Sequence, residues 1–116
     1  MRNFLLPFSI VVVTACSKTT GTSKSFSSSE CSSTISFKTD IQPMMNSYCV
    51  SCHKSGNAKG GYDLSTYSGV TSNTSKVLAS MLHNSGAKPM PEDADQLSDD
   101  LLKKMYCWVN QGAKNN

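Results

Sequence analysis

The sequence predicts an all-α domain of three to five short helices. Apolar residues recur at helical spacing in three stretches, 37–48, 75–82 and 97–109. The last stretch has the clearest start signal, because Ser98 stands at the position of an N-cap and two aspartates follow it. A chain of 116 residues is long enough for one such domain.

The first expected helix carries the apolar stripe from Phe37 to Tyr48. Asp40 can cap its start, which places Pro43 in the first turn, where a missing N–H is tolerated. Three glycines lie within residues 54–61, and this composition predicts a loop after the helix.

The N-terminus has the pattern of a secretory signal peptide over residues 1–15. Arg2 gives it a positive start, and the apolar run that follows is too short to span a bilayer, which takes roughly 20 residues. The sequence from Val13 to Cys16 resembles the lipobox of bacterial lipoproteins, in which the cysteine is acylated. The alternative is ordinary cleavage followed by a chance cysteine.

Residues 16–34 are expected to form a flexible tether, and residues 35–116 the folded domain. Twelve of the eighteen residues from Ser17 to Thr34 are Ser or Thr. A segment with so few apolar side chains cannot bury enough surface to offset its ordering entropy. The tether would hold the domain away from the membrane.

The net charge is small. The whole chain carries +3 at pH 7, and loss of the signal peptide with Arg2 leaves +2. A nucleic-acid-binding protein needs a dense basic face. We therefore expect no nucleic-acid partner.

The residues from Cys49 to His53 read Cys-Val-Ser-Cys-His, which is the C-x-x-C-H pattern of covalent c-type haem attachment. Two thiols add across the two vinyl groups of one porphyrin, and the two-residue spacer sets the sulfurs at a matching separation. The histidine after Cys52 then supplies the proximal nitrogen to the iron. The sequence therefore predicts one covalently attached haem c.

A second candidate ligand is Met90. Prolines on both sides of it stiffen the backbone, and a weak thioether ligand binds iron well only when the chain holds it in place. The alternatives are a surface methionine at this position, or His83 as the distal ligand. Met44 and Met45 lie too close to the attachment point to reach the other haem face.

The chain has five cysteines. Lipid would occupy Cys16, and haem would occupy Cys49 and Cys52. Cys31 and Cys107 remain, and in an oxidising compartment such a pair is expected to form a disulfide. The alternative is two unpaired thiols, one in the tether and one on the last helix.

From about Phe37 onward the chain resembles the small bacterial class I cytochrome c domains. The stretches that carry the resemblance are Asp40-Ile41-Gln42-Pro43, Cys49 to His53, Asp63-Leu64-Ser65-Thr66-Tyr67, Pro89-Met90-Pro91, Leu97-Ser98-Asp99 and Trp108-Val109-Asn110-Gln111-Gly112-Ala113.

The resemblance implies a small cytochrome c fold, with short helices wrapped around the covalently attached haem. It implies thioether bonds from Cys49 and Cys52, with His53 as proximal and Met90 as distal ligand. It also implies that the first and last helices cross. The Gly-x-x-aromatic pattern common at that crossing is absent from the first helix of this chain.

These observations predict a one-electron carrier and not an enzyme, because filled axial positions leave no site for a substrate. We expect an exported, lipid-anchored monomer on a bacterial membrane, facing the periplasm or the outer surface, with a redox partner protein. Lys54, Lys59 and Lys88 either ring the haem edge and meet an acidic partner, or are scattered solubilising side chains.

Two other classes of protein stay open, a haem protein with an open distal site and a haem-free protein. A peroxidase-like or gas-sensing haem protein would need an open distal site. A haem-free dithiol oxidoreductase would need a βαβ context, and a zinc protein would need further ligands near Cys49, Cys52 and His53.

Overall fold

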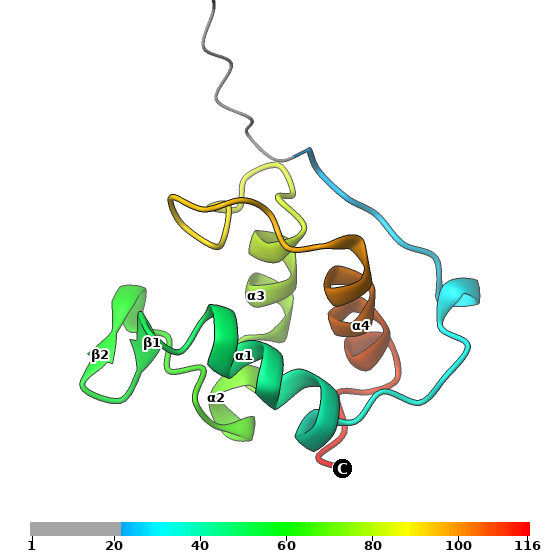
Figure 1. Cartoon of the computed structure of the whole chain (residues 1–116), viewed down its shortest axis with the longest axis horizontal. Coiled ribbons are helices and arrows are strands. Elements are labelled where there is room, and N and C mark those ends of the chain that lie inside the picture. Colours follow the sequence, from blue (N-terminus) through cyan, green and yellow to red (C-terminus); the bar gives the residue numbers. More distant parts are fainter. Residues whose placement is uncertain (1–21) are drawn as a thin grey trace, which may run out of the picture.

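The computed structural model describes residues 22–116 (Figure 1). The predicted signal peptide over 1–15, the predicted lipid attachment at Cys16 and the first residues of the predicted tether lie outside the described residues. The elements, with η marking single 3-10 or π turns, are η1 (Ser28–Glu30), η2 (Phe37–Ile41), α1 (Gln42–Tyr48), β1 (His53–Lys54), β2 (Asn57–Ala58), η3 (Lys59–Gly61), α2 (Tyr67–Thr71), α3 (Thr74–Met81) and α4 (Asp99–Asn110).

The first helix begins earlier than expected, as the π-helical turn η2 that continues into α1. Ser36 is the N-cap, because its side chain accepts a hydrogen bond from the Thr39 N–H. Asp40 is not the cap that the sequence suggested; its carboxylate instead accepts from the Ser36 N–H at 3.1 Å. Pro43 lies in the first turn of α1, as expected.

An aromatic cluster forms where η2 packs on α4. The rings of Phe37 and Trp108 lie 5.6 Å apart, and the Tyr67 ring contacts both of them at 5.1 and 6.3 Å. Trp108 is fully buried, and its indole N–H donates to the Lys114 carbonyl. The other fully buried large side chains are Ile41, Met45, Val70, Leu102 and Met105.

The all-α prediction is wrong, because the described residues contain a two-stranded antiparallel sheet directly after α1. His53 pairs with Ala58, and Lys54 pairs with Asn57. Gly56 lies in the turn with φ +81°, a conformation that glycine adopts without strain. The segment expected as a loop thus folds back on itself, so that backbone groups after the C-x-x-C-H motif pair with each other.

The later helices match the sequence pattern more closely. Ser98 caps α4 and accepts a hydrogen bond from the Leu101 N–H, as predicted. Leu97 and Leu102 are both buried at the start of this helix, in the positions of a hydrophobic staple. No helix among residues 22–116 is long and apolar enough to cross a membrane.

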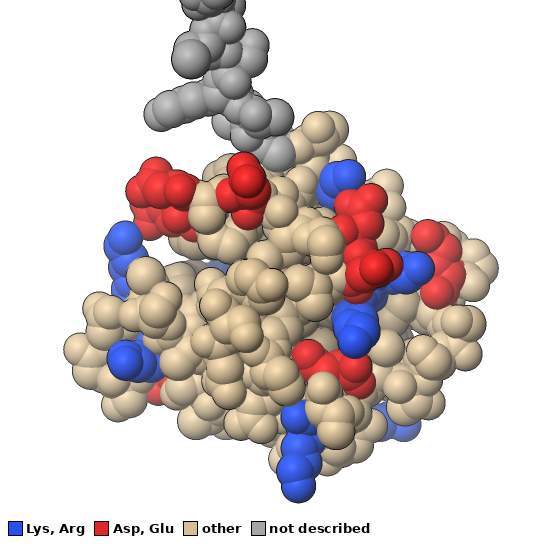
Figure 2. Space-filling model, viewed as in Figure 1, with Lys and Arg blue, Asp and Glu red and all other residues tan. Residues whose placement is uncertain are grey.

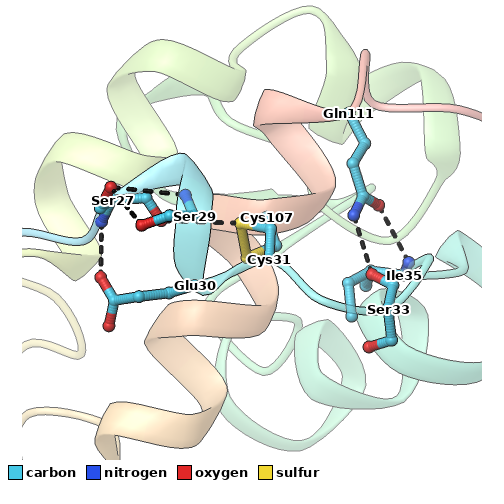
Figure 3. The surroundings of a disulfide bond; sticks show 8 residues. All are labelled: Ser27, Ser29, Glu30, Cys31, Ser33, Ile35, Cys107 and Gln111. Carbon is cyan, nitrogen blue, oxygen red and sulfur yellow. Dashed lines mark hydrogen bonds between the residues drawn. A yellow bond between two sulfur atoms is a disulfide. The ribbon is translucent and has the colours of Figure 1, made fainter.

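Residues 24–35, which we call the strap, run along α4 and do not form the expected tether (Figure 3). Cys31 is bonded to Cys107. The Gln111 side chain donates to the Ser33 carbonyl and accepts from the Ile35 N–H. The predicted tether over 16–34 is therefore wrong for residues 24–34, because these contacts supply the stability that the strap's own composition lacks.

The upper end of the strap is held as well. The Lys24 N–H donates to the Leu82 carbonyl at 2.9 Å, just beyond α3. The Lys24 ammonium lies 3.0 Å from the Asp99 carboxylate, and the Phe26 ring lies 5.9 Å from the Tyr106 ring. The packed unit consequently begins near residue 24 and not at residue 35.

Candidate functional site

A cavity of about 1310 Å³ opens between the C-x-x-C-H motif and the segment that joins α3 to α4. Ligand pockets commonly measure about 300 to 1,000 Å³, so this one is large enough for a bulky cofactor. In Figure 1 the hairpin that begins within the motif lies on the lower left, and the connecting segment lies above it. The apolar residues of the lining include Tyr62, Leu64, Val77, Met81, Leu97 and Leu101.

The backbone of the motif is a tight turn that continues from α1. The Cys49 N–H donates to the Met45 carbonyl, and the Cys52 and His53 N–H groups both donate to the Cys49 carbonyl. The His53 carbonyl accepts from the Leu64 N–H at 2.8 Å. Cys49, Cys52 and His53 all line the cavity, so the turn brings the three predicted attachment residues to one wall.

The two thiols of the motif are free and differ in exposure. Cys52 is exposed, whereas burial raises the pKa of Cys49 to about 11. Dithiol oxidoreductases activate a cysteine by lowering its pKa, because the thiolate is the nucleophile. Cys49 therefore lacks the environment of an activated thiol.

His53 has an unused ring nitrogen. Its Nδ1 is buried and has no hydrogen-bond partner among the described residues. A buried polar group left in this way costs about 1–3 kcal/mol, so its position suggests a role that stability does not explain. Tyr62 meets the ring edge-on at 6.3 Å, and the Lys76 ammonium lies 5.8 Å from the centre of the Tyr62 ring. This environment fits an imidazole that is held in place to bind a ligand.

Met90 lines the cavity from the other segment, and α3 fixes its backbone. The Met90 N–H donates to the Ser80 carbonyl at 3.1 Å, and its own carbonyl accepts from His83 Nε2 at 3.1 Å. His83 is not among the described residues that line the cavity. The structure thus gives the rival ligand a different position, as a hydrogen-bond donor to the backbone of Met90.

Met44 and Met45 belong to the core and are 3% and 1% exposed. Neither lies among the described cavity-lining residues, whereas Met81 does. Two methionines of the cavity wall are therefore Met81 and Met90. Met81 ends the apolar stripe of α3, a position that predicts a core residue and gives no signal of a cavity-lining one.

Residues 22–116 contain no group of three or more His, Cys, Asp or Glu side chains that could hold a metal ion. A zinc site, which needs a closed set of such ligands, has no ligand set there. The predicted all-α cytochrome c fold is therefore not supported on this point either. The described residues contain no metal-binding group of this kind. A haem makes a smaller demand on the chain, because the porphyrin surrounds the iron with its own nitrogens.

Comparison of the chain with protein-family models, with curated proteins and with solved structures gives no match. The resemblance stated from the motifs consequently remains a prediction.

Proposed function

We propose that this chain is a one-electron carrier with a single c-type haem, attached through Cys49 and Cys52 and ligated by His53 and Met90. The observation that carries the proposal is that these four residues, from two separate segments, line one large cavity. The unpartnered nitrogen of His53 supports it further.

When bound, the haem supplies the one-electron chemistry. The chain's own residues bind and orient it. Cys49 and Cys52 would fix its position covalently, and the hydrogen bonds to the backbone of Met90 hold that residue at the cavity wall. The apolar side chains of the lining would contact the porphyrin, and a thioether ligand raises the reduction potential.

This arrangement leaves the carrier no substrate to transform, so we propose no catalytic activity. Electrons would be exchanged with a redox partner protein through the exposed side of the motif, where Cys52 reaches the surface. We propose that the carrier acts as a monomer.

We further propose that the carrier is exported and anchored by lipid at Cys16. The strap makes this anchor short. Seven residue steps separate Cys16 from Ser23, whose hydroxyl already donates to the Asn84 side chain, and they span at most about 25 Å. A lipid on Cys16 would therefore hold the cavity-bearing domain close to the membrane surface, where a partner embedded in that membrane can reach it.

The ligand assignment is tested on protein produced with a haem-attachment system. The ferric protein should show the weak far-red band of methionine-ligated iron. Met90→Ala should abolish this band, whereas Met81→Leu, a change at another cavity-lining methionine, should retain it. His83→Ala should weaken the band without abolishing it, because it removes one hydrogen bond to the Met90 backbone.

A full band in Met90→Ala would contradict the assignment. Tight carbon monoxide binding by the reduced wild-type protein would favour an open distal site, and with it the peroxidase-like or gas-sensing alternative.

A further inference from the structure

An ionic bridge crosses the mouth of the cavity. Lys59, in η3 on the motif side, places its ammonium 2.9 Å from Glu92 Oε2. Lys88 places its ammonium 2.6 Å from the other carboxylate oxygen, Oε1. Lys88 and Glu92 flank Met90 at two residues on either side, and all three charged residues line the cavity.

The bridge joins the two segments that hold the proposed ligands. Figure 2 shows acidic side chains over the segment after α3, at the upper left, and basic side chains just below them. On its other side the Met90 backbone is hydrogen-bonded to Ser80 of α3 and to His83 just beyond that helix. The Lys59–Glu92 pair is thus a contact between the Met90 segment and the motif side of the cavity.

We infer that Glu92 is a positioning residue, which holds the Met90 segment against the motif side through Lys59 and so keeps Met90 at the cavity. The role of Met90 as a ligand rests on the proposed function. The contact of its segment with the motif side rests on the ion pairs alone. It also revises the role of two lysines. Lys59 and Lys88 are both paired with Glu92 within the chain, which lowers their charge available to an acidic partner.

Glu92 differs from its acidic neighbours in both exposure and partners. Its side chain is 31% exposed and uses both oxygens, whereas Asp93 and Asp95 are exposed. The two lysines hold the pKa of Glu92 at about 2, mainly through their hydrogen bonds to the carboxylate. The carboxylate is thus charged and engaged under ordinary conditions.

The test compares Glu92→Gln with Asp95→Asn, which removes the same charge from the same segment. Amide hydrogen exchange of residues 87–95 in the protein as purified reports opening of the segment whether or not haem is bound. An exposed ion pair shifts an equilibrium by up to about fivefold, so Glu92→Gln should accelerate exchange by roughly two- to fivefold. Asp95→Asn should exchange like the wild type.

Two lysine variants separate the bridge across the mouth from the pair within the segment. Lys59→Gln should reproduce most of the effect of Glu92→Gln, and Lys88→Gln should show little of it. Salt screens exposed charges. Raising the salt from about 0.01 M to about 1 M should therefore raise the exchange rate of the wild type toward that of Glu92→Gln and leave the rate of that variant unchanged.

In the haem-loaded protein, Glu92→Gln should also weaken the far-red band and lower the reduction potential, which a loss of general stability would not do at a temperature where both proteins are folded. Equal exchange in Glu92→Gln and Asp95→Asn would overturn the inference. An effect of Lys88→Gln without one of Lys59→Gln would do the same. A colourless product in which the variants still show the expected hydrogen exchange would refute the haem proposal and support the ionic bridge.

Discussion

The strap face and the cavity face of the molecule are held together by different kinds of interaction. On the strap face a disulfide joins Cys31 to a buried Cys107, and the Gln111 side chain makes two hydrogen bonds to the strap backbone. On the cavity face the exposed Lys59–Glu92 ion pair joins the two segments, and His53 keeps a buried nitrogen that has no hydrogen-bond partner among residues 22–116.

This contrast separates stability from function. The strap face, with the aromatic cluster beneath it, holds the helices whether or not a ligand is present. The cavity face carries the exposed thiol, the unused nitrogen and the weakly held segment. A cofactor bound there would stabilise the folded state by mass action. Three changes would break or sharpen the comparison.

Removal of the disulfide should have the largest effect. Cys31 and Cys107 are 76 residues apart, and a cross-link that closes such a loop stabilises a protein by about 4 kcal/mol in the chain-entropy model. The paired change Cys31→Ser with Cys107→Ser should lower the free energy of unfolding by about this amount in a denaturant titration. The far-red band at low temperature should persist, because the strap contributes no cavity ligand. A loss of the band in the folded variant would show that the two faces are coupled.

Truncation of the core should come next. Met105 is fully buried in the hydrophobic core, and Met105→Ala should cost about 3 kcal/mol through lost burial and the cavity that remains. Tyr48, at the cavity mouth, is 47% exposed, and Tyr48→Ala should cost less than about 1 kcal/mol. Thermal unfolding of the two variants provides the measurement. Equal losses would mean that the cavity face carries as much stability as the core.

The smallest expected effect is on the pH dependence of stability, through Asp40. A hydrogen bond from the Ser36 N–H, then the Lys104 ammonium 3.0 Å away, lower the pKa of this carboxyl below its ordinary value of 3.8. A carboxyl with a lowered folded-state pKa stabilises the fold above its unfolded value, and the contribution disappears as the pH falls through the folded value. Asp40→Asn should therefore destabilise by at most about 1 kcal/mol at pH 7, and by progressively less as the pH falls below 3.8.

The unfolding midpoints of the wild type and Asp40→Asn, measured across this pH range, check that sign. A difference between the two midpoints that grows as the pH falls would contradict a lowered pKa for Asp40.

The sequence predicted the parts of the fold that local signals determine. Ser98 caps α4 as its position before the apolar stripe indicated, and Pro43 lies in the first turn of α1. The hairpin after His53 was missed because its strands are only two residues long, too short for any alternation of apolar and polar residues. The three glycines within residues 54–61 were the local signal, and they predicted a loop without showing that the flanking residues pair.

Composition misled the interpretation of the strap. Serine and threonine dominate residues 24–34, and their side chains bury little apolar surface. The order of this segment comes from partners that are distant in the sequence, such as Leu82 just beyond α3 and Cys107 on α4. The cysteine count pointed to one of these contacts, and the structure joins Cys31 to Cys107.

The candidate site could be assembled in part from spacing alone. The motif named Cys49, Cys52 and His53, and the proline pair singled out Met90; the structure places all of them at one cavity. The roles of His83 and Glu92 depend on which groups meet in the folded chain. No local sequence pattern predicts the hydrogen bond from His83 to the Met90 carbonyl, or the ion pair between Glu92 and Lys59, which are 33 residues apart.

Covalent attachment of haem to Cys49 and Cys52 is the central claim, and one measurement tests it most directly. The protein is produced with a c-type haem-attachment system, unfolded in denaturant and separated from free haem. We predict that the haem absorption stays with the unfolded chain, and that it is lost from the chain in Cys49→Ala with Cys52→Ala. A wild-type chain that emerges without this absorption would contradict the account.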